Sequence, residues 1–187
     1  MSFANHATMK QIVRKPINGI YHNCRSVFDL DQVKIKVMSD SICFYVDSSL
    51  QNALYALVQT CRYFQSDLLC RDSPVLVRGA VTKGLLYADD HLIFGQGFVD
   101  AYLQEETNAI YPRIIVLDSV LDVAKQSMDE DLIPVLNVFI YHDSDGRYMI
   151  DYLDSFDGHD TTGRRREKLY RYIEDTLARS SLSKLYI

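Results

Sequence analysis

The sequence lacks several features that would assign a protein class at once. It has no tryptophan, and its four cysteines, Cys24, Cys43, Cys61 and Cys70, form no CxxC pair. This argues against a zinc ribbon and indicates a reducing compartment. No apolar run reaches the ~18 residues of a membrane span, and no basic-then-apolar leader opens the chain. We therefore expect a cytoplasmic protein with no membrane partner.

An excess of basic residues is also absent. The chain has 20 Lys and Arg against 25 Asp and Glu, giving a net charge of -5. General nucleic-acid binders are usually basic, so we expect no nucleic-acid partner. Its 187 residues, 48% of them hydrophobic, are enough to bury a core without disulfides or metals. The length predicts a single domain over residues 1–187.

The hydrophobic pattern that is present predicts short strands and one long helix. Residues 33–38 alternate apolar side chains with lysines, and residues 42–46 follow after a short polar stretch, so the two form a tight hairpin. The next helix, capped by Asp47, Ser48 or Ser49, runs to about Cys70. Its apolar residues recur at spacings of three and four and predict one buried stripe. They are Leu50, Leu54, Leu57, Cys61, Phe64 and Leu68.

The second half of the chain continues this alternation. Strands are predicted at 75–82, 113–117, 135–141 and 147–153, and helices at 95–108, 119–128 and 163–180. Residues 85–87 and 92–94 flank a turn at Asp89-Asp90, and the last two strands join at Asp143-Ser144-Asp145-Gly146. The order predicts an α+β fold with a mostly antiparallel sheet, ending in a C-terminal hairpin and helix over 135–180.

One ordered set of motifs lies between residues 36 and 113. It begins with Lys36-Val37-Met38-Ser39-Asp40-Ser41 at the hairpin tip and continues with Arg78-Gly79 and the later Gly84. Phe94-Gly95 then precedes a helix, and Tyr111-Pro112-Arg113-Ile114 closes the set. In this order the motifs resemble the catalytic domain of class III nucleotidyl cyclases, and most of all the compact bacterial branch that includes the pyrimidine cyclases of Pycsar anti-phage defence. The resemblance covers about residues 30–118.

The resemblance implies a fold, an activity and an assembly. The fold would be ferredoxin-like, of the palm type, with helices packed on the sheet. The activity would convert a nucleoside triphosphate, UTP or CTP in this branch, to a 3′,5′-cyclic monophosphate and pyrophosphate, as a signal in anti-phage defence. Active sites in the family form between two subunits, so a head-to-tail homodimer is implied.

The resemblance also implies Mg²⁺ or Mn²⁺, hard cations that take carboxylate ligands. Two such ions can lower the charge on the attacking and leaving oxygens. Asp40 is the candidate ligand, although Asp is also an ordinary turn residue. The family carries a second aspartate on a first strand that would precede Met1, with Ser2-Phe3 where a Gly-Phe follows that strand. Either the sequence starts late, or it is a diverged homologue that has lost the strand.

Four further positions are candidate nucleotide contacts. Ser39 and Ser41 flank Asp40, and Lys36 occupies the family's base-contacting lysine position, although a solvated strand lysine is the alternative. Leu92 stands where adenylyl cyclases carry a base-reading Asp or Thr. Because an apolar side chain cannot hydrogen-bond the adenine amino group, Leu92 fits the pyrimidine branch better.

Arg78 and Arg113 are the candidate catalytic cations that would bind the phosphates. Each lies in or beside an apolar strand, where an unpaired guanidinium is costly, so each is expected to have a partner. A buried structural salt bridge is the alternative for both. A second function also stays open, that of a catalytically impaired cyclase-homology domain acting as a nucleotide sensor or dimerisation module. A diguanylate cyclase is disfavoured because no Gly-Gly-Asp/Glu-Glu-Phe run occurs.

Overall fold

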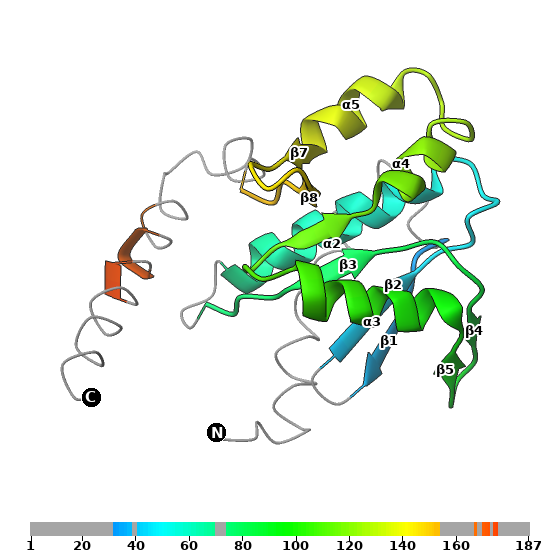
Figure 1. Cartoon of the computed structure of the whole chain (residues 1–187), viewed down its shortest axis with the longest axis horizontal. Coiled ribbons are helices and arrows are strands. Elements are labelled where there is room, and N and C mark those ends of the chain that lie inside the picture. The colour runs from blue at the N-terminus through cyan, green and yellow to red at the C-terminus, as the bar shows by residue number, and fades with distance from the viewer. Residues whose placement is uncertain are drawn as a thin grey trace.

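The structure is a computed structural model that describes residues 32–38, 41–69 and 74–153, together with 167, 170–172 and 174–175 (Figure 1). The named elements of this part are β1 (Lys34–Met38), β2 (Ser41–Tyr45), α2 (Ala53–Leu69), β3 (Gly79–Val81), β4 (Tyr87–Ala88), β5 (Ile93–Phe94), α3 (Gln96–Asn108), β6 (Ile114–Val116), α4 (Asp118–Ala124), α5 (Leu132–Phe139), β7 (Ile140–His142) and β8 (Tyr148–Ile150). The described residues of the expected last helix are helical, and the rest of 163–180 lies outside the description.

The fold is α+β, and four of the five strand pairings among its described residues are antiparallel, as predicted. The strands nevertheless form three sheets among the described residues rather than one. The hairpins β1–β2 and β4–β5 each stand alone, and β3, β6, β8 and β7 make a four-stranded sheet in that order. Its β3–β6 pair is parallel. No helix of the described part is long and apolar enough to cross a membrane.

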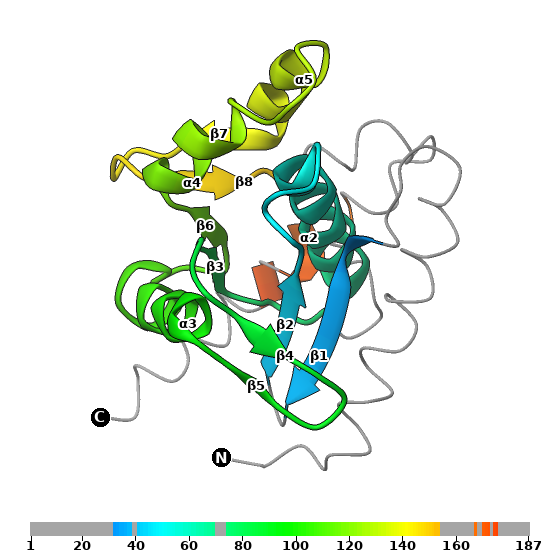
Figure 2. The ribbon, with the colours of Figure 1, turned by 90° about the vertical axis from the view of Figure 1, so that its right-hand side faces the viewer.

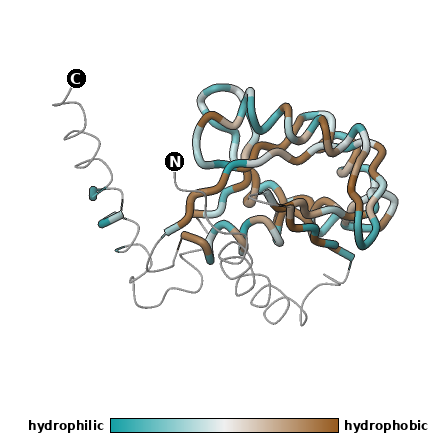
Figure 3. Tube along the Cα trace, turned by 90° about the horizontal axis from the view of Figure 1, so that it is seen from below, coloured by the Kyte–Doolittle hydropathy of each residue, from teal (hydrophilic) through white to brown (hydrophobic). Residues whose placement is uncertain are grey.

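Helix α2 packs against both the β1–β2 hairpin and the four-stranded sheet (Figure 2). On the hairpin side, Phe64 meets Phe44 edge to face with ring centroids 5.1 Å apart. On the sheet side, Val58 and Cys61 share a buried cluster with Ile150. Hydrophilic stretches concentrate on the outer turns of the described chain and hydrophobic stretches run through its interior (Figure 3). The apolar stripe predicted for this helix is therefore its packing surface from Leu54 onward, whereas Leu50 lies before α2 and is 37% exposed.

The strand predicted at 135–141 is wrong, because this segment is mainly helix α5. Its β-branched and aromatic residues favoured a strand. Pro134 is tolerated because it lies in the first turn of the helix. Leu136 is fully buried, and Phe139 lies 6.1 Å from Tyr55 of α2, centroid to centroid. Tertiary packing on α2 thus overrides the local preference for a strand.

The start of α3 depends on a close approach between two chain segments. Gly95 has a φ of 138°, and a Cβ at this position would lie 2.3 Å from the carbonyl oxygen of Leu85. The hydroxyl of Thr82 donates a 2.8 Å hydrogen bond to the carbonyl of Gly97. Glycine at position 95 therefore allows α3 to lie against the segment that follows β3.

Candidate functional site

A cleft of about 1330 Å³ lies between β2 and β3. Helix α2 forms its floor with Leu54, Leu57, Cys61, Phe64 and Leu68 of the predicted stripe, and Leu50 lines the cleft from the segment before the helix. Residues of α3, α4 and β6 and the segments 75–78 and 82–86 also line it. Of the predicted site residues, Ser41 and Arg78 line this cleft. The cleft therefore joins two candidates that are 37 positions apart in the sequence.

Two other candidates meet where the β1–β2 hairpin touches the β4–β5 turn. The Nζ of Lys36 donates a 2.7 Å hydrogen bond to the backbone carbonyl of Asp89. The N–H of Asp89 in turn donates to the carbonyl of Leu92 at 3.0 Å. Lys36 and Leu92 are thus linked through one residue, and the side chain of Leu92 is 57% exposed beside this contact.

The carboxylate of Asp89 shapes this turn. Its oxygens accept hydrogen bonds from the backbone N–H groups of Leu92 (2.8 Å) and His91 (2.7 Å) and from the hydroxyl of Tyr87 (2.9 Å). The same contacts hold the pKa of Asp89 below its ordinary value, and the hydrogen bond from the Leu92 amide is the largest cause. The charged carboxylate fixes the loop in which Leu92 projects to solvent. The sequence indicates only a turn at Asp89-Asp90, and no local pattern predicts the contact of Asp89 with Lys36.

Arg78 forms an ion pair with Glu105 of α3, with a nitrogen–oxygen distance of 2.7 Å. The side chain of Arg78 is 43% exposed, and both residues line the cleft. The expectation that this arginine has a partner is confirmed. An exposed pair of this kind is weak and exchanges readily with solvent or another anion.

Arg113 occupies a different environment. Its side chain is 3% exposed, and its guanidinium binds the carboxylates of both Asp143 and Asp145 at the β7–β8 turn. A third hydrogen bond runs to the carbonyl of Asn108 at 3.2 Å. The hydrogen bond from Arg113 is the main cause that lowers the pKa of Asp145. The structure therefore places Arg113 in the buried salt bridge that the sequence left as an alternative, and Arg113 itself does not line the cleft.

Ser39 and Asp40 lie outside the described residues, so the expected metal ligand has no described geometry. Within the described ranges, no three His, Cys, Asp or Glu side chains come together as a metal site. Asp40 has no described carboxylate partner for such a site. The described residues alone therefore do not fit a divalent ion.

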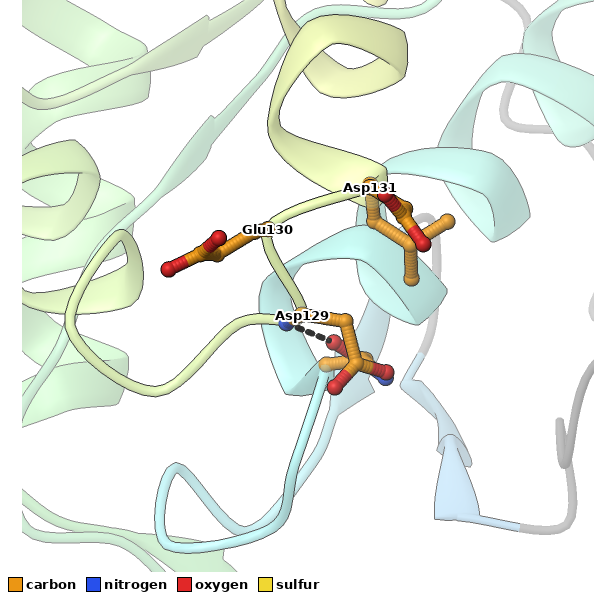
Figure 4. Close-up of a pocket in the computed structure, with 5 residues that line it drawn as sticks. Asp129, Glu130 and Asp131 are labelled. Carbon is orange, nitrogen blue, oxygen red and sulfur yellow. Dashed lines mark hydrogen bonds between the residues drawn. The ribbon is translucent and has the colours of Figure 1, made fainter.

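One acidic loop, between α4 and α5, lines a second and smaller cavity (Figure 4). The backbone N–H of Asp129 donates to the side-chain oxygen of Asn52 at 2.9 Å, and the Asn52 amide donates back to the Asp129 carboxylate at 2.8 Å. Glu130 and Asp131 point away from this pair in Figure 4. The contacts tie the loop to the start of α2 and make Asp129 a structural residue.

Three partners in these sites were not found from the sequence, namely Glu105, Asp143 and Asp145. The last two were interpreted only as a turn signal. No local pattern links them to Arg113, which is 30 and 32 positions away. Comparison with known proteins adds no further residue, since no protein-family model, curated protein or solved structure matches this chain.

Proposed function

We propose that this chain is a nucleotidyl cyclase domain that acts on a nucleoside triphosphate, with UTP or CTP preferred. The 3′-oxygen of the ribose attacks the α-phosphorus, a new phosphorus–oxygen bond forms, and the bond to pyrophosphate breaks. The hydroxyl proton passes to solvent. The ordered motifs from Lys36 to Arg113 are the basis of this proposal.

The observation that supports it most is the contact between Lys36 and Asp89. It brings Lys36, the lysine expected to contact the base, next to the turn that carries Leu92. Lys36 and Asp89 are 53 positions apart in the sequence. An ammonium group has three donors, so Lys36 can bind the Asp89 carbonyl and still donate to a base carbonyl. Leu92 offers an apolar surface without a hydrogen-bonding group, which suits a base that is not selected through an exocyclic amino group at this position.

Positive charge for the phosphates would come from the cleft rather than from Arg113. Arg78 lines the cleft, is 43% exposed and pairs there with Glu105. Lys83 lines the same cleft and is exposed. Arg113 is neutralised by two carboxylates, so we assign it to the fold and not to the substrate.

Mg²⁺ or Mn²⁺ would lower the charge on the triphosphate oxygens when bound. Asp40 is the residue proposed to hold it. The described residues provide no further carboxylate cluster for it. We therefore propose that the nucleotide is oriented by Lys36, Arg78 and Lys83, and that none of these three binds a metal.

A homodimer also belongs to the proposal. Several large apolar side chains on the β4–β5 hairpin and α3 are exposed, and two of them, Tyr87 and Phe94, stack with centroids 5.0 Å apart. The set is Leu85, Tyr87, Leu92, Phe94, Val99, Tyr102 and Leu103. Clustered exposed apolar side chains of this kind mark protein interfaces more often than solvent-facing surfaces.

A second function, a nucleotide sensor without turnover, is favoured by one observation. Arg113, one of two arginines expected to act on the phosphates, is held by Asp143 and Asp145. A domain with one fewer free cation can bind a triphosphate and still fail to stabilise the charge that develops when pyrophosphate leaves.

One experiment separates these functions. The chain is incubated with each of the four nucleoside triphosphates and Mn²⁺, products are identified by mass spectrometry, and binding is measured in parallel. We expect cyclic UMP or cyclic CMP in excess of cyclic AMP and cyclic GMP. Lys36→Met should weaken use of the preferred nucleotide by about tenfold or more, since a hydrogen bond to a charged donor is lost. Lys125→Met, at the exposed end of α4, is the matched control.

Each other outcome has a defined meaning. Equal or better use of ATP overturns the pyrimidine preference. Binding without any turnover replaces the cyclase with the sensor. Absence of both binding and turnover contradicts the two functions together.

A further inference from the structure

We propose that Asp89 is a positioning residue for the nucleotide base. Its carboxylate shapes the β4–β5 turn so that its own backbone carbonyl holds the ammonium group of Lys36 beside Leu92. This inference rests on the proposed function, in which Lys36 and Leu92 meet the base. Asp89 acts through Lys36 and not on the nucleotide itself.

The turn depends on its own hydrogen bonds because the hairpin that carries it is very short. Strands β4 and β5 form only two residue pairs, and no other described strand joins them. A two-stranded ribbon of this size is marginally stable by itself. Tyr87 stacks on Phe94, but this pair lies at the end of the ladder away from the turn. The conformation of residues 89–92 is therefore set by contacts within the turn.

The two carboxylate oxygens of Asp89 hold different parts of this turn. Oδ1 accepts hydrogen bonds from the backbone N–H groups of His91 and Leu92, whereas Oδ2 accepts from the hydroxyl of Tyr87. The N–H of Asp89 donates to the carbonyl of Leu92 at 3.0 Å. The side chain and the backbone of Asp89 thus bridge the two strands. Together they fix the direction of the carbonyl that Lys36 binds.

Lys36 differs from its neighbour Lys34 in this contact. The two lysines lie on the same face of β1, because side chains alternate along a strand. Lys34 is exposed, whereas Lys36 is half-buried and its Nζ donates to the Asp89 carbonyl at 2.7 Å. The hydrogen bond from the Leu92 amide is the largest cause that lowers the pKa of Asp89, and the charge of Lys36 adds to it. The ammonium group is therefore held by a carbonyl and attracted by a carboxylate of the same residue.

Holding Lys36 in advance favours binding of a base. A lysine side chain has a flexible four-carbon stem and takes many rotamers unless a contact orders it. A donor that is ordered before the ligand arrives loses less entropy on binding, so affinity rises. The base is remote from the phosphorus that reacts. Loss of the Asp89 carboxylate should therefore weaken binding of the nucleotide and leave the chemical step nearly unchanged.

Acetylation of the lysines tests the positioning without any nucleotide. The chain is treated with limiting acetic anhydride, and the rate at Lys36 is compared with the rate at Lys34 by fragment-ion mass spectrometry. Only a free, unprotonated amine attacks the anhydride, so a lysine whose ammonium group is hydrogen-bonded reacts more slowly. We expect Asp89→Ala to raise the ratio of the Lys36 rate to the Lys34 rate about fivefold, the value of one hydrogen bond.

Two variants show whether the carboxylate acts as proposed. Asp89→Asn keeps an oxygen for the two backbone N–H groups and should hold the ratio within about twofold of wild type. Asp90→Ala removes an equal charge from the same turn, and among the described residues the Asp90 side chain has no hydrogen bond or ion pair. It should leave the ratio unchanged. An unchanged ratio in Asp89→Ala, or an equal rise in Asp90→Ala, would overturn the proposal.

Nucleotide kinetics test the consequence at the base. With the preferred pyrimidine triphosphate and Mn²⁺, Asp89→Ala should raise KM about fivefold and keep kcat within about twofold. Asp89→Asn should restore KM, and Asp90→Ala should not change it. An altered acetylation ratio with unaltered KM would overturn the role of Asp89 at the base. The expected acetylation ratios in a wild-type chain that neither binds nor converts any triphosphate would support the positioning of Lys36 and contradict the proposed function.

Discussion

The guanidinium of Arg113, at the start of β6, is bound by the carboxylate of Asp145, 32 residues further along the chain in the β7–β8 turn. Arg113 is almost fully buried, whereas 40% of the Asp145 side chain is exposed. The pair therefore joins the interior of the four-stranded sheet to a surface turn.

Arg113→Met should destabilise the fold strongly, because Asp143 and Asp145 lose their common partner. Removing one member of a buried pair costs about 3–5 kcal/mol, and we expect roughly 2–4 here because both carboxylates keep some solvent. Urea unfolding measures the loss. Arg78→Met is the matched control, since its exposed pair with Glu105 is worth about 1 kcal/mol or less. Equal effects of the two changes would contradict the structural assignment of Arg113.

Stability should fall on acidification below pH ~4, the ordinary carboxyl range. The pKa of Asp145 is lower in the folded protein, so the unfolded chain takes up the proton first as the pH falls. The stabilisation is fully present above this range and is lost as the pH falls through the folded-state pKa. Asp145→Asn should flatten the dependence of the unfolding free energy on pH, and an unchanged dependence would contradict the role of this carboxylate.

Gly95→Ala should cost roughly 3 kcal/mol or more, because an alanine there combines an unfavourable φ with a clash against the Leu85 carbonyl. Gly146→Ala is the control. Its φ is 80°, but nothing lies within 4 Å of the added Cβ, so about 1 kcal/mol is expected from the backbone alone. Thermal unfolding of the two variants checks the difference, and a similar cost for both would show that α3 does not need the close approach.

Leu92→Thr should raise the use of ATP relative to UTP, because threonine restores a hydrogen-bonding group beside Lys36. One such contact is worth about 1 kcal/mol, or roughly fivefold in the ratio of the two activities. Competition between the two triphosphates measures the ratio. Val138→Thr, at an exposed position of α5, is the control, and an unchanged ratio in Leu92→Thr would show that residue 92 does not contact the base.

Phe94→Lys should shift a dimer toward monomer, since it places a charge in the exposed apolar cluster of the β4–β5 hairpin. Sedimentation velocity with nucleotide present measures the change. Tyr141→Lys on β7 replaces an aromatic of nearly the same exposure, 55% against 56%, and should leave the assembly intact. A wild-type monomer at high concentration would contradict the homodimer.

Local patterns predicted those parts of the fold whose contacts are close in sequence. The alternation at 33–38 indicates one buried face of a strand and predicts the hairpin. The spacing from Leu54 to Leu68 indicates one buried face of a helix and predicts α2. Helix α5 could not be predicted in this way, because packing of Phe139 on Tyr55 decides it. The need of Arg113 for a partner was predictable from burial cost. The identity of the partner was not, since the pairing of β6 with β8 brings Asp145 to Arg113 from 32 positions away in the sequence.

Helix α2 contributes to two hydrophobic clusters at once, one under the β1–β2 hairpin and one under the four-stranded sheet. Phe64 and Leu68 of this helix lie in the cluster under the hairpin, while Val58 and Cys61 lie in the cluster under the sheet. The hairpin and the four-stranded sheet therefore share one helix as their common support, and a substitution that displaces α2 disturbs the packing of both.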